Sequence, residues 1–272
     1  MEVIHRVTFN KVAGVDKQLD SLGITYKRSD LPAGYYIITF EIKESDTNWL
    51  LVENLIKEKN GADFMGIVFT EEEILKADYS RMLVTYEQGY PYPESEWQNN
   101  RQKIYEDYCV ECGVYKEQSG NFRTKNEFNT KNGFVSLMWS SAATFCSPEV
   151  INAFTENNFS GFTTKDIYIK NYNEKSKYKQ LSVNNVTGNG MLNENIKFEN
   201  CKKCGTNKFE FIKDNYLMYK RSALQDIDFQ KTNEWFGTGW IAFQQIIISR
   251  KVAKVILENK WKGIKLEPLL LE

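Results

Sequence analysis

"CVECG" (residues 109–113) and "CKKCG" (residues 201–205) are two copies of one short turn in a chain that has only five cysteines. Two cysteines separated by two residues place their thiols on one side of a tight loop, at the spacing that grips a single zinc ion. The glycine after the second cysteine allows a positive φ, so the backbone can curl around the sulfurs. The turns therefore predict two halves of a metal site.

The two turns together predict a closed, tetrahedral site. Four thiolates leave no open coordination position, so we expect the metal to be structural and not catalytic. Because the turns are far apart in sequence, two separate parts of the chain must pack side by side, and the metal closes a long loop between them. We predict a structural zinc ion with the ligands Cys109, Cys112, Cys201 and Cys204.

Two other interpretations of the cysteine turns stay open. A redox pair usually stands at the N-terminus of a helix, but "GVYKEQSG" (113–120) and "GTNKFEF" (205–211) are typical of ribbons. The turns could also have lost the metal and be held by packing alone. The fifth cysteine, Cys146, precedes the expected helix cap Ser147, so we expect a small buried residue there and not a nucleophile.

An internal repeat links the two cysteine turns to the rest of this region. "SPEVINAFTENNFSGFT" (147–163) aligns without a gap with "SRKVAKVILENKWKGIK" (249–265). Each copy predicts a helix capped by serine, a glycine that ends the turn, and a following strand. Chance similarity between two amphipathic helices is the alternative interpretation. The identical pairs are Ser147/Ser249, Val150/Val252, Glu156/Glu258, Asn157/Asn259 and Gly161/Gly263.

The fold class that these patterns predict is α+β, in two domains. Residues 1–95 alternate strand-like and helical stretches, such as "GYYIITFEI" (34–42) and "NWLLVENLIKEKNG" (48–61), and predict a small α/β layer domain of unknown role. The proline-containing stretch 88–100 indicates the boundary. Residues 96–272 then form a two-fold repeated α+β region with the split zinc knuckle. Its two related halves span about 101–170 and 196–272.

Composition narrows the function classes. The 272 residues include 35 basic and 36 acidic side chains, a balance that argues against a dominant nucleic-acid or anionic-membrane partner. No apolar run spans a bilayer and no signal peptide is evident, so we expect a cytoplasmic protein with reduced thiols and no membrane partner. His5 is the only histidine, which excludes a zinc-protease histidine pair.

A segment that interleaves lysine with tyrosine, "KDIYIKNYNEKSKYKQ" (165–180), is the one candidate surface for nucleic acid. Tyrosines can stack on bases while lysines neutralise phosphates. The balanced net charge instead favours a solvated strand and loop whose tyrosines pack inward. In the nucleic-acid alternative, the contact residues are Lys170, Tyr172, Lys175, Lys177, Tyr178 and Lys179.

The cysteine turns, together with "DIDFQKTNEWFGTG" (226–239) and "IIISRKVAKVILENKWKGIKLEPL" (246–269), resemble bacterial double-CxxCG proteins. The resemblance covers roughly 101–272 and leaves the first hundred residues unmatched. Such proteins are similar to immunity proteins found beside polymorphic toxins. The resemblance implies metal ligation by the four cysteines and nothing finer, so it points to no enzymatic activity in particular.

Three functional hypotheses follow from the sequence. The first is a cytoplasmic, non-enzymatic protein-binding protein with a structural zinc site, whose partner in the immunity interpretation is a toxin. The alternative is a zinc-ribbon protein that binds nucleic acid. The third is an enzyme with its site in the N-terminal domain or between the domains, although no catalytic motif in the sequence names a reaction.

Overall fold

The computed structural model describes residues 1–170, 172, 174–194, 196–212 and 216–272, and it has a mixed α+β structure. The described chain forms two compact units, Met1–Thr70 and Glu71–Ile212 with Tyr216–Glu272. The sequence predicts a boundary near residue 95, but the structure ends the first unit at Thr70. The reason is β5 (Tyr79–Val84), which pairs with two strands near the C-terminus and so belongs to the second unit.

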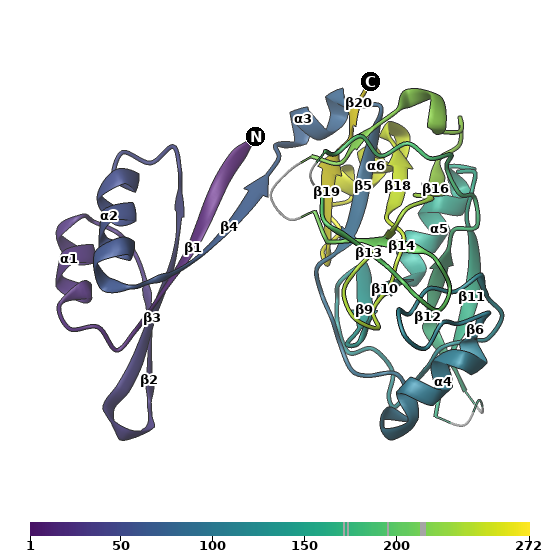
Figure 1. Cartoon of the computed structure of the whole chain (residues 1–272), viewed down its shortest axis with the longest axis horizontal. Helices are drawn as coiled ribbons and strands as arrows, with labels where there is room; N and C mark the ends of the chain where they lie inside the picture. The colour runs from purple at the N-terminus through teal and green to yellow at the C-terminus, as the bar shows by residue number, and fades with distance from the viewer. Residues whose placement is uncertain (171, 173, 195, 213–215) are drawn as a thin grey trace. The chain divides into compact units, whose positions relative to one another are not determined.

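The first unit is an antiparallel sheet in the order β2-β3-β1-β4 with two helices on one face (Figure 1). The chain order is β-α-β-β-α-β, the split arrangement in which each helix connects two parallel strands that are not neighbours. The elements are β1 (Glu2–Asn10), α1 (Val15–Ser21), β2 (Lys27–Leu31), β3 (Tyr35–Lys43), α2 (Trp49–Lys59) and β4 (Ala62–Val68).

Helix α2 contributes one apolar face to the core of the first unit. The helical spacing predicts that Trp49, Val52, Leu55 and Ile56 share this face, and all four are buried against the sheet. His5 is also buried, as a residue of β1. Its ring stacks on the Trp49 ring at 3.7 Å between centroids, and its Nδ1 lies 2.9 Å from the Asp63 carboxylate.

The second unit contains a sheet in the order β8-β11-β12-β10-β9. All neighbours are antiparallel except β8 and β11, which run parallel. Helix α5 connects β10 to β11, and its apolar residues Val150 and Phe154 are fully buried. The elements are β8 (Arg123–Thr124), β9 (Phe134–Leu137), β10 (Ser140–Cys146), α5 (Pro148–Glu156), β11 (Thr163–Ile169) and β12 (Glu174–Ser182).

A second sheet of this unit has the order β16-β18-β5-β19 and is antiparallel throughout. Helix α6 connects β18 to β19, as α5 connects β10 to β11, and α3 lies beside α6 (Figure 1). The strand β5 in this sheet comes from a distant part of the chain, whereas β12, at the corresponding place in the first sheet, follows β11 directly. The elements are α3 (Glu71–Lys76), β16 (Phe229–Lys231), β18 (Ile246–Ser249), α6 (Arg250–Glu258) and β19 (Ile264–Pro268).

The turn after each of these helices packs on the other sheet. Gly161, after α5, has a φ of 89°, and a Cβ built on it would lie 2.1 Å from the Phe229 carbonyl oxygen in β16. Gly263, after α6, has a φ of 87°, and its Cβ would lie 2.0 Å from the Phe134 carbonyl oxygen in β9. Any side chain at either glycine would overlap backbone atoms, so both close approaches depend on glycine.

The two predicted serine caps differ in their hydrogen bonds. Ser249 Oγ accepts from the amide of Val252, as expected at a helix N-terminus. Ser147 occupies the same position before α5, but its hydroxyl donates to the Glu149 carboxylate instead. The predicted side-chain cap is therefore confirmed for α6 and wrong for α5, where Pro148 at the first helical position leaves one amide fewer to satisfy.

Smaller pieces complete the second unit. Helix α4 (Trp97–Ile104) precedes the ribbon of β6 (Tyr105–Glu106) and β7 (Glu117–Gln118). A three-stranded sheet has the order β13-β14-β17, and β15 pairs with β20. The last elements of this unit are β13 (Phe198–Asn200), β14 (Asn207–Phe209), β15 (Met218–Tyr219), β17 (Trp235–Phe236), β20 (Leu270–Leu271) and the 3-10 turns Glu94–Glu96 and Arg221–Ala223. A further 3-10 turn, Pro32–Gly34, lies in the first unit.

Candidate metal centre

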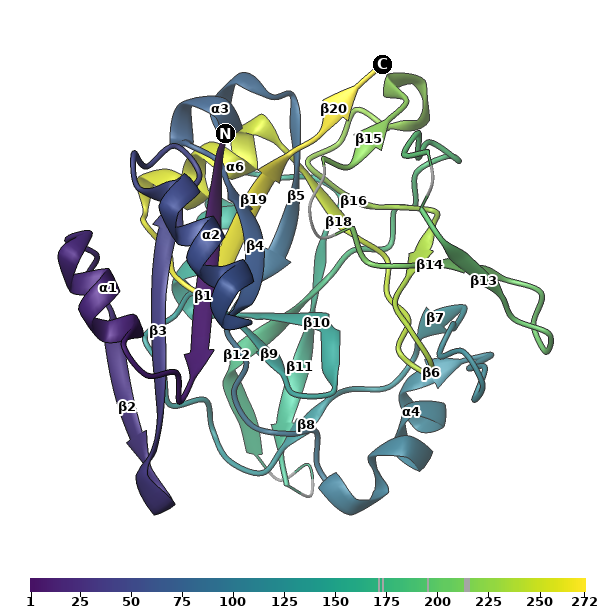
Figure 2. The same cartoon turned by 60° about the vertical axis from the view of Figure 1, so that its left-hand side comes forward.

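Each cysteine turn is the loop of a short antiparallel hairpin. The first turn, residues 109–113, lies between β6 and β7. The second turn, residues 201–205, lies between β13 and β14, and Figure 2 shows this hairpin projecting from the second unit. The prediction of ribbons in place of helices after the turns is therefore confirmed. A thiol at the N-terminus of a helix, which a redox pair needs, is absent from both turns in the described structure.

The two turns have the same backbone hydrogen bonds, and we call them the first and the second knuckle. The amide of Gly113 donates to the Cys109 carbonyl at 2.8 Å, and the amide of Gly205 donates to the Cys201 carbonyl at the same distance. Both glycines have a positive φ, 79° and 73°. This conformation folds each turn back so that its two thiols face the other knuckle.

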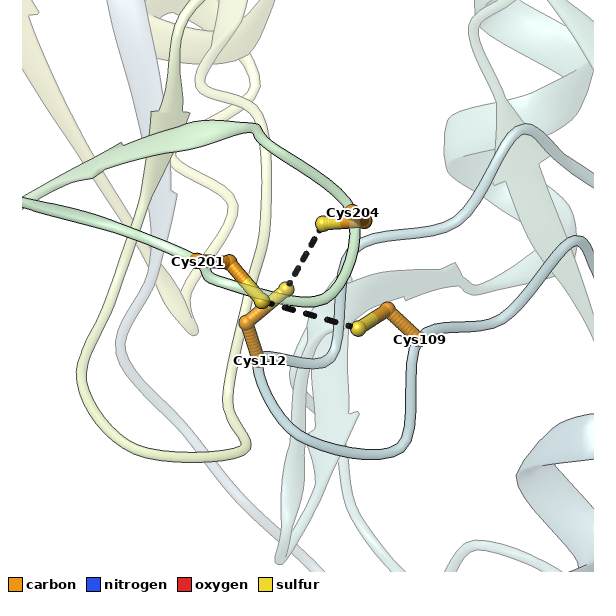
Figure 3. Close-up of side chains that lie close together, drawn as sticks. All are labelled: Cys109, Cys112, Cys201 and Cys204. Atoms are coloured by element: carbon orange, nitrogen blue, oxygen red, sulfur yellow. Dashed lines mark hydrogen bonds between the residues drawn. The ribbon is translucent and has the colours of Figure 1, made fainter.

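The four sulfurs converge on one point (Figure 3). All four Sγ atoms lie within 4.8 Å of one another, with 3.8 Å between Cys109 and Cys201 and 3.5 Å between Cys112 and Cys204. A tetrahedron of sulfurs about 2.3 Å from a central ion has edges of about 3.8 Å. The cysteines are free thiols. They could therefore hold a metal ion with little movement.

The cysteines of the two knuckles differ in how deeply they are buried. Cys109 and Cys112 are buried, whereas Cys201 is half-buried and Cys204 is exposed. Burial raises the pKa of the Cys112 thiol. Burial also opposes charge on Cys204, but hydrogen bonds from the Thr206 hydroxyl and amide outweigh it and lower the pKa of that thiol to about 6. The second knuckle thus offers the more readily ionised ligand.

A buried cation lies beside the cluster. Lys208, in β14, is 3% exposed, and its Nζ donates to the Cys112 carbonyl at 3.1 Å and to the Gly239 carbonyl. A positive charge next to a set of thiolates favours their ionised form. Lys208 also joins the second hairpin to the first knuckle through a contact that does not involve the metal.

The loop 237–242 anchors the first knuckle from the other side. The carbonyl of Trp240 lies so close to Gly113 that a Cβ on the glycine would be 2.2 Å from its oxygen. Tyr115, just after the knuckle, meets the ring of Trp235 edge-on at 4.9 Å between centroids. The first knuckle therefore packs closely on other parts of the second unit, while nothing lies within 4 Å of a Cβ on Gly205.

The candidate nucleic-acid residues differ in how accessible they are. Tyr178 is 2% exposed, packs in an apolar cluster and donates its hydroxyl to the Asn132 carbonyl, so it is not free to stack on a base. Lys175 and Lys179 both form ion pairs with Asp166. Of the remaining candidates, Lys170, Lys177 and Tyr172 are exposed.

The remaining predicted residues have structural surroundings. Cys146 is fully buried at the end of β10, and burial raises the pKa of its thiol, in agreement with a packing role. His5 belongs to the first unit and lies in its core. The structure therefore brings together the four predicted metal ligands and leaves these two residues buried elsewhere.

Sequence reasoning missed three residues around the metal centre: Lys208, Trp240 and Arg101. Arg101, in α4, donates to the Trp240 carbonyl at 3.2 Å and its guanidinium lies 4.0 Å from the centre of the Trp240 ring. No pattern in the sequence distinguishes Lys208 and Arg101 from solvated lysines and arginines. The aromatic stretch 234–240 with its two glycines was the only available signal, because it indicates a turn that packs closely on something.

No protein-family model matches this chain, and no curated protein matches it. None of the helices in the described part of the chain combines the length and apolar character that a membrane span requires.

Proposed function

We propose that the four cysteines bind one zinc ion with a structural role. The observation that carries this proposal is the convergence of four free thiols from two hairpins at distances that fit a tetrahedral zinc–thiolate centre. Zinc suits a set of four thiolates, and four protein ligands leave no position for a substrate or an activated water. The ion then fastens the second knuckle to the first, in a cytoplasmic setting that keeps thiols reduced.

We further propose that the second unit contains a two-fold repeat. The strand orders β9-β10-β12-β11 and β16-β18-β5-β19 correspond, and so do the helices α5 and α6. The registers also correspond: Phe145 lies opposite Gln180 in one sheet, and Ile247 lies opposite Arg81 in the other. In this repeat, β12 and β5 occupy corresponding places in the two sheets, and both lie outside the halves 101–170 and 196–272 that the sequence predicts.

The biological role that we propose is non-enzymatic binding of a protein partner. The supporting observation is a groove of about 720 Å³ whose lining includes Tyr90, Tyr92, Phe128 and Trp139. Trp139 is 48% exposed and has a positive φ of 64°, a costly conformation for a bulky residue, and its ring lies 4.5 Å from that of Tyr90. Exposed tryptophan and tyrosine are enriched where proteins bind one another.

The resemblance to bacterial double-CxxCG proteins gives the partner a specific form. In the immunity interpretation, the partner is a toxin protein that this chain neutralises. Affinity capture from the native host with wild-type chain, Trp139→Ala and the matched exposed aromatic control Phe198→Ala tests this role. We expect one protein partner retained by the wild type and the control and lost by Trp139→Ala. Absence of any partner, or equal retention by all three, contradicts it.

Nucleic-acid binding stays as the alternative function, with a single favourable observation. The guanidinium of Arg123 lies 4.7 Å from the centre of the exposed Tyr172 ring, an arrangement that could also stack on a base. Binding of this kind weakens steeply with salt. Retention on heparin at low salt that is lost in Tyr172→Ala would favour the alternative, and passage without retention excludes it.

A further inference from the structure

A small cavity behind the first knuckle is lined by residues from α4, from the start of β10 and from the loop 237–242. Its volume is about 30 Å³. A cavity needs about 10 to 15 Å³ to hold one water molecule, so this one has room for a water or a small ion. The lining includes Trp97, Arg101, Tyr108, Ser140, Trp240 and Ile241.

Arg101 brings a buried positive charge to this cavity. It is 6% exposed, and its NH1 group donates to the Tyr108 hydroxyl at 2.8 Å and to the Trp240 carbonyl at 3.2 Å. Within the described residues, no carboxylate forms an ion pair with Arg101. Arginine stays protonated in proteins, and burying a charge without an opposite charge is unfavourable. Neutral carbonyl, hydroxyl and ring contacts compensate it only in part.

Polar atoms without partners belong to the same lining. The Nε atom of Arg101 and the Nε1 atom of Trp97 are buried and have no hydrogen-bond partner. Arginine and tryptophan side chains can only donate. A water molecule placed among them would accept their hydrogen bonds but would find few acceptors for its own two hydrogens. An anion accepts from all of them and also balances the charge.

We propose that this cavity binds a single small monovalent anion of the size of chloride. The anion accepts hydrogen bonds from the Arg101 Nε and Trp97 Nε1 groups. The Trp240 carbonyl that accepts from Arg101 is the same carbonyl that lies against Gly113 in the first knuckle. Anion binding therefore holds α4, the loop 237–242 and the first knuckle together, next to the metal centre but independently of its ligands.

Anomalous diffraction from crystals of the full chain soaked in sodium bromide tests the site directly. We expect a bromide peak in the cavity between Arg101 and Trp97. The variant Arg101→Met is expected to lose this peak. Arg123→Met, which removes a more exposed arginine, is expected to keep it. A cavity with only a water at saturating bromide overturns the proposal, as does a peak that persists in Arg101→Met.

Thermal unfolding gives a second test that does not need crystals. At constant ionic strength, replacing gluconate by bromide is expected to raise the Tm of the wild type with a saturating concentration dependence. Arg101→Lys keeps the positive charge but lacks Nε, and it is expected to lose most of this shift. Equal Tm values in bromide and gluconate for the wild type contradict the proposal, even if the Arg101 variants fail to fold.

Discussion

The two knuckles have the same sequence pattern and the same internal hydrogen bonds, but their surroundings differ. Cys109 and Cys112 are buried and Gly113 packs on the Trp240 carbonyl, whereas Cys204 is exposed and Gly205 has open space around it. The local motif therefore determines the shape of each turn, while distant contacts determine how firmly it is held. The first knuckle is part of a packed core, and we expect the second to depend more on the proposed metal ion for its position.

The largest effect in this comparison is expected on removing the metal. Chelation should lower the free energy of unfolding, because metal binding contributes directly to stability in thiolate zinc sites. Hydrogen exchange should then accelerate more in 198–209, whose β13 is exposed along its whole length, than in 105–118. Measurement of exchange by mass spectrometry with and without chelator checks this asymmetry. Equal acceleration in both hairpins would contradict the difference between the knuckles.

The glycines of the two knuckles provide the next test. Gly113→Ala should lower the free energy of unfolding by about 3 to 5 kcal/mol, because the added Cβ would overlap a backbone carbonyl and the positive φ is unfavourable for alanine. Gly205→Ala should cost only about 1 to 2 kcal/mol, since it adds the backbone strain alone. Chemical denaturation of both variants measures the two values, and similar values would show that the knuckles are held alike.

A second pair of glycines, at the turns after α5 and α6, tests the proposed repeat. Gly161→Ala and Gly263→Ala should each lower the free energy of unfolding by about 3 to 5 kcal/mol, because both Cβ atoms would overlap a carbonyl of the opposite sheet. The two losses should agree within about 1 kcal/mol if the halves are equivalent. Chemical denaturation checks both, and a large loss at only one glycine would argue against equivalent packing.

The smallest effect concerns thiol reactivity after chelation. Alkylation should modify Cys204 first, because it is exposed and its thiol pKa is lowered to about 6. Its rate should rise between pH 5 and 7 and then level off, since the thiolate forms as the pH rises through the pKa. The buried Cys146 serves as the internal control and should react last. Peptide mass spectrometry follows both, and faster modification of Cys112 would reverse the expected order.

Sequence reasoning was strongest where the chemistry is local. The four cysteine ligands and the buried face of α2 follow from short spacings that need no tertiary information. The domain boundary does not follow from such short spacings, because β5 pairs with strands that lie far along the chain. β2, with the sequence "KRSDL", is a mostly exposed edge strand without apolar alternation, so no pattern predicts it.

The residues around the metal centre were beyond sequence reasoning for a related reason. Lys208 and Arg101 carry charges that are ordinarily solvated, and only their burial distinguishes them. Burial depends on the loop 237–242 and on α4, which approach the first knuckle from different parts of the chain. The four clustered cysteines could thus be predicted, whereas the contacts around them could not.

The central claim is that one zinc ion joins the two knuckles. Elemental analysis of the purified chain, with Cys201→Ser as the matched variant, tests it most directly. We predict one zinc per wild-type chain and loss of the metal, with loss of stability, in Cys201→Ser. A wild-type chain without zinc that forms a reversible disulfide between these cysteines would contradict the claim.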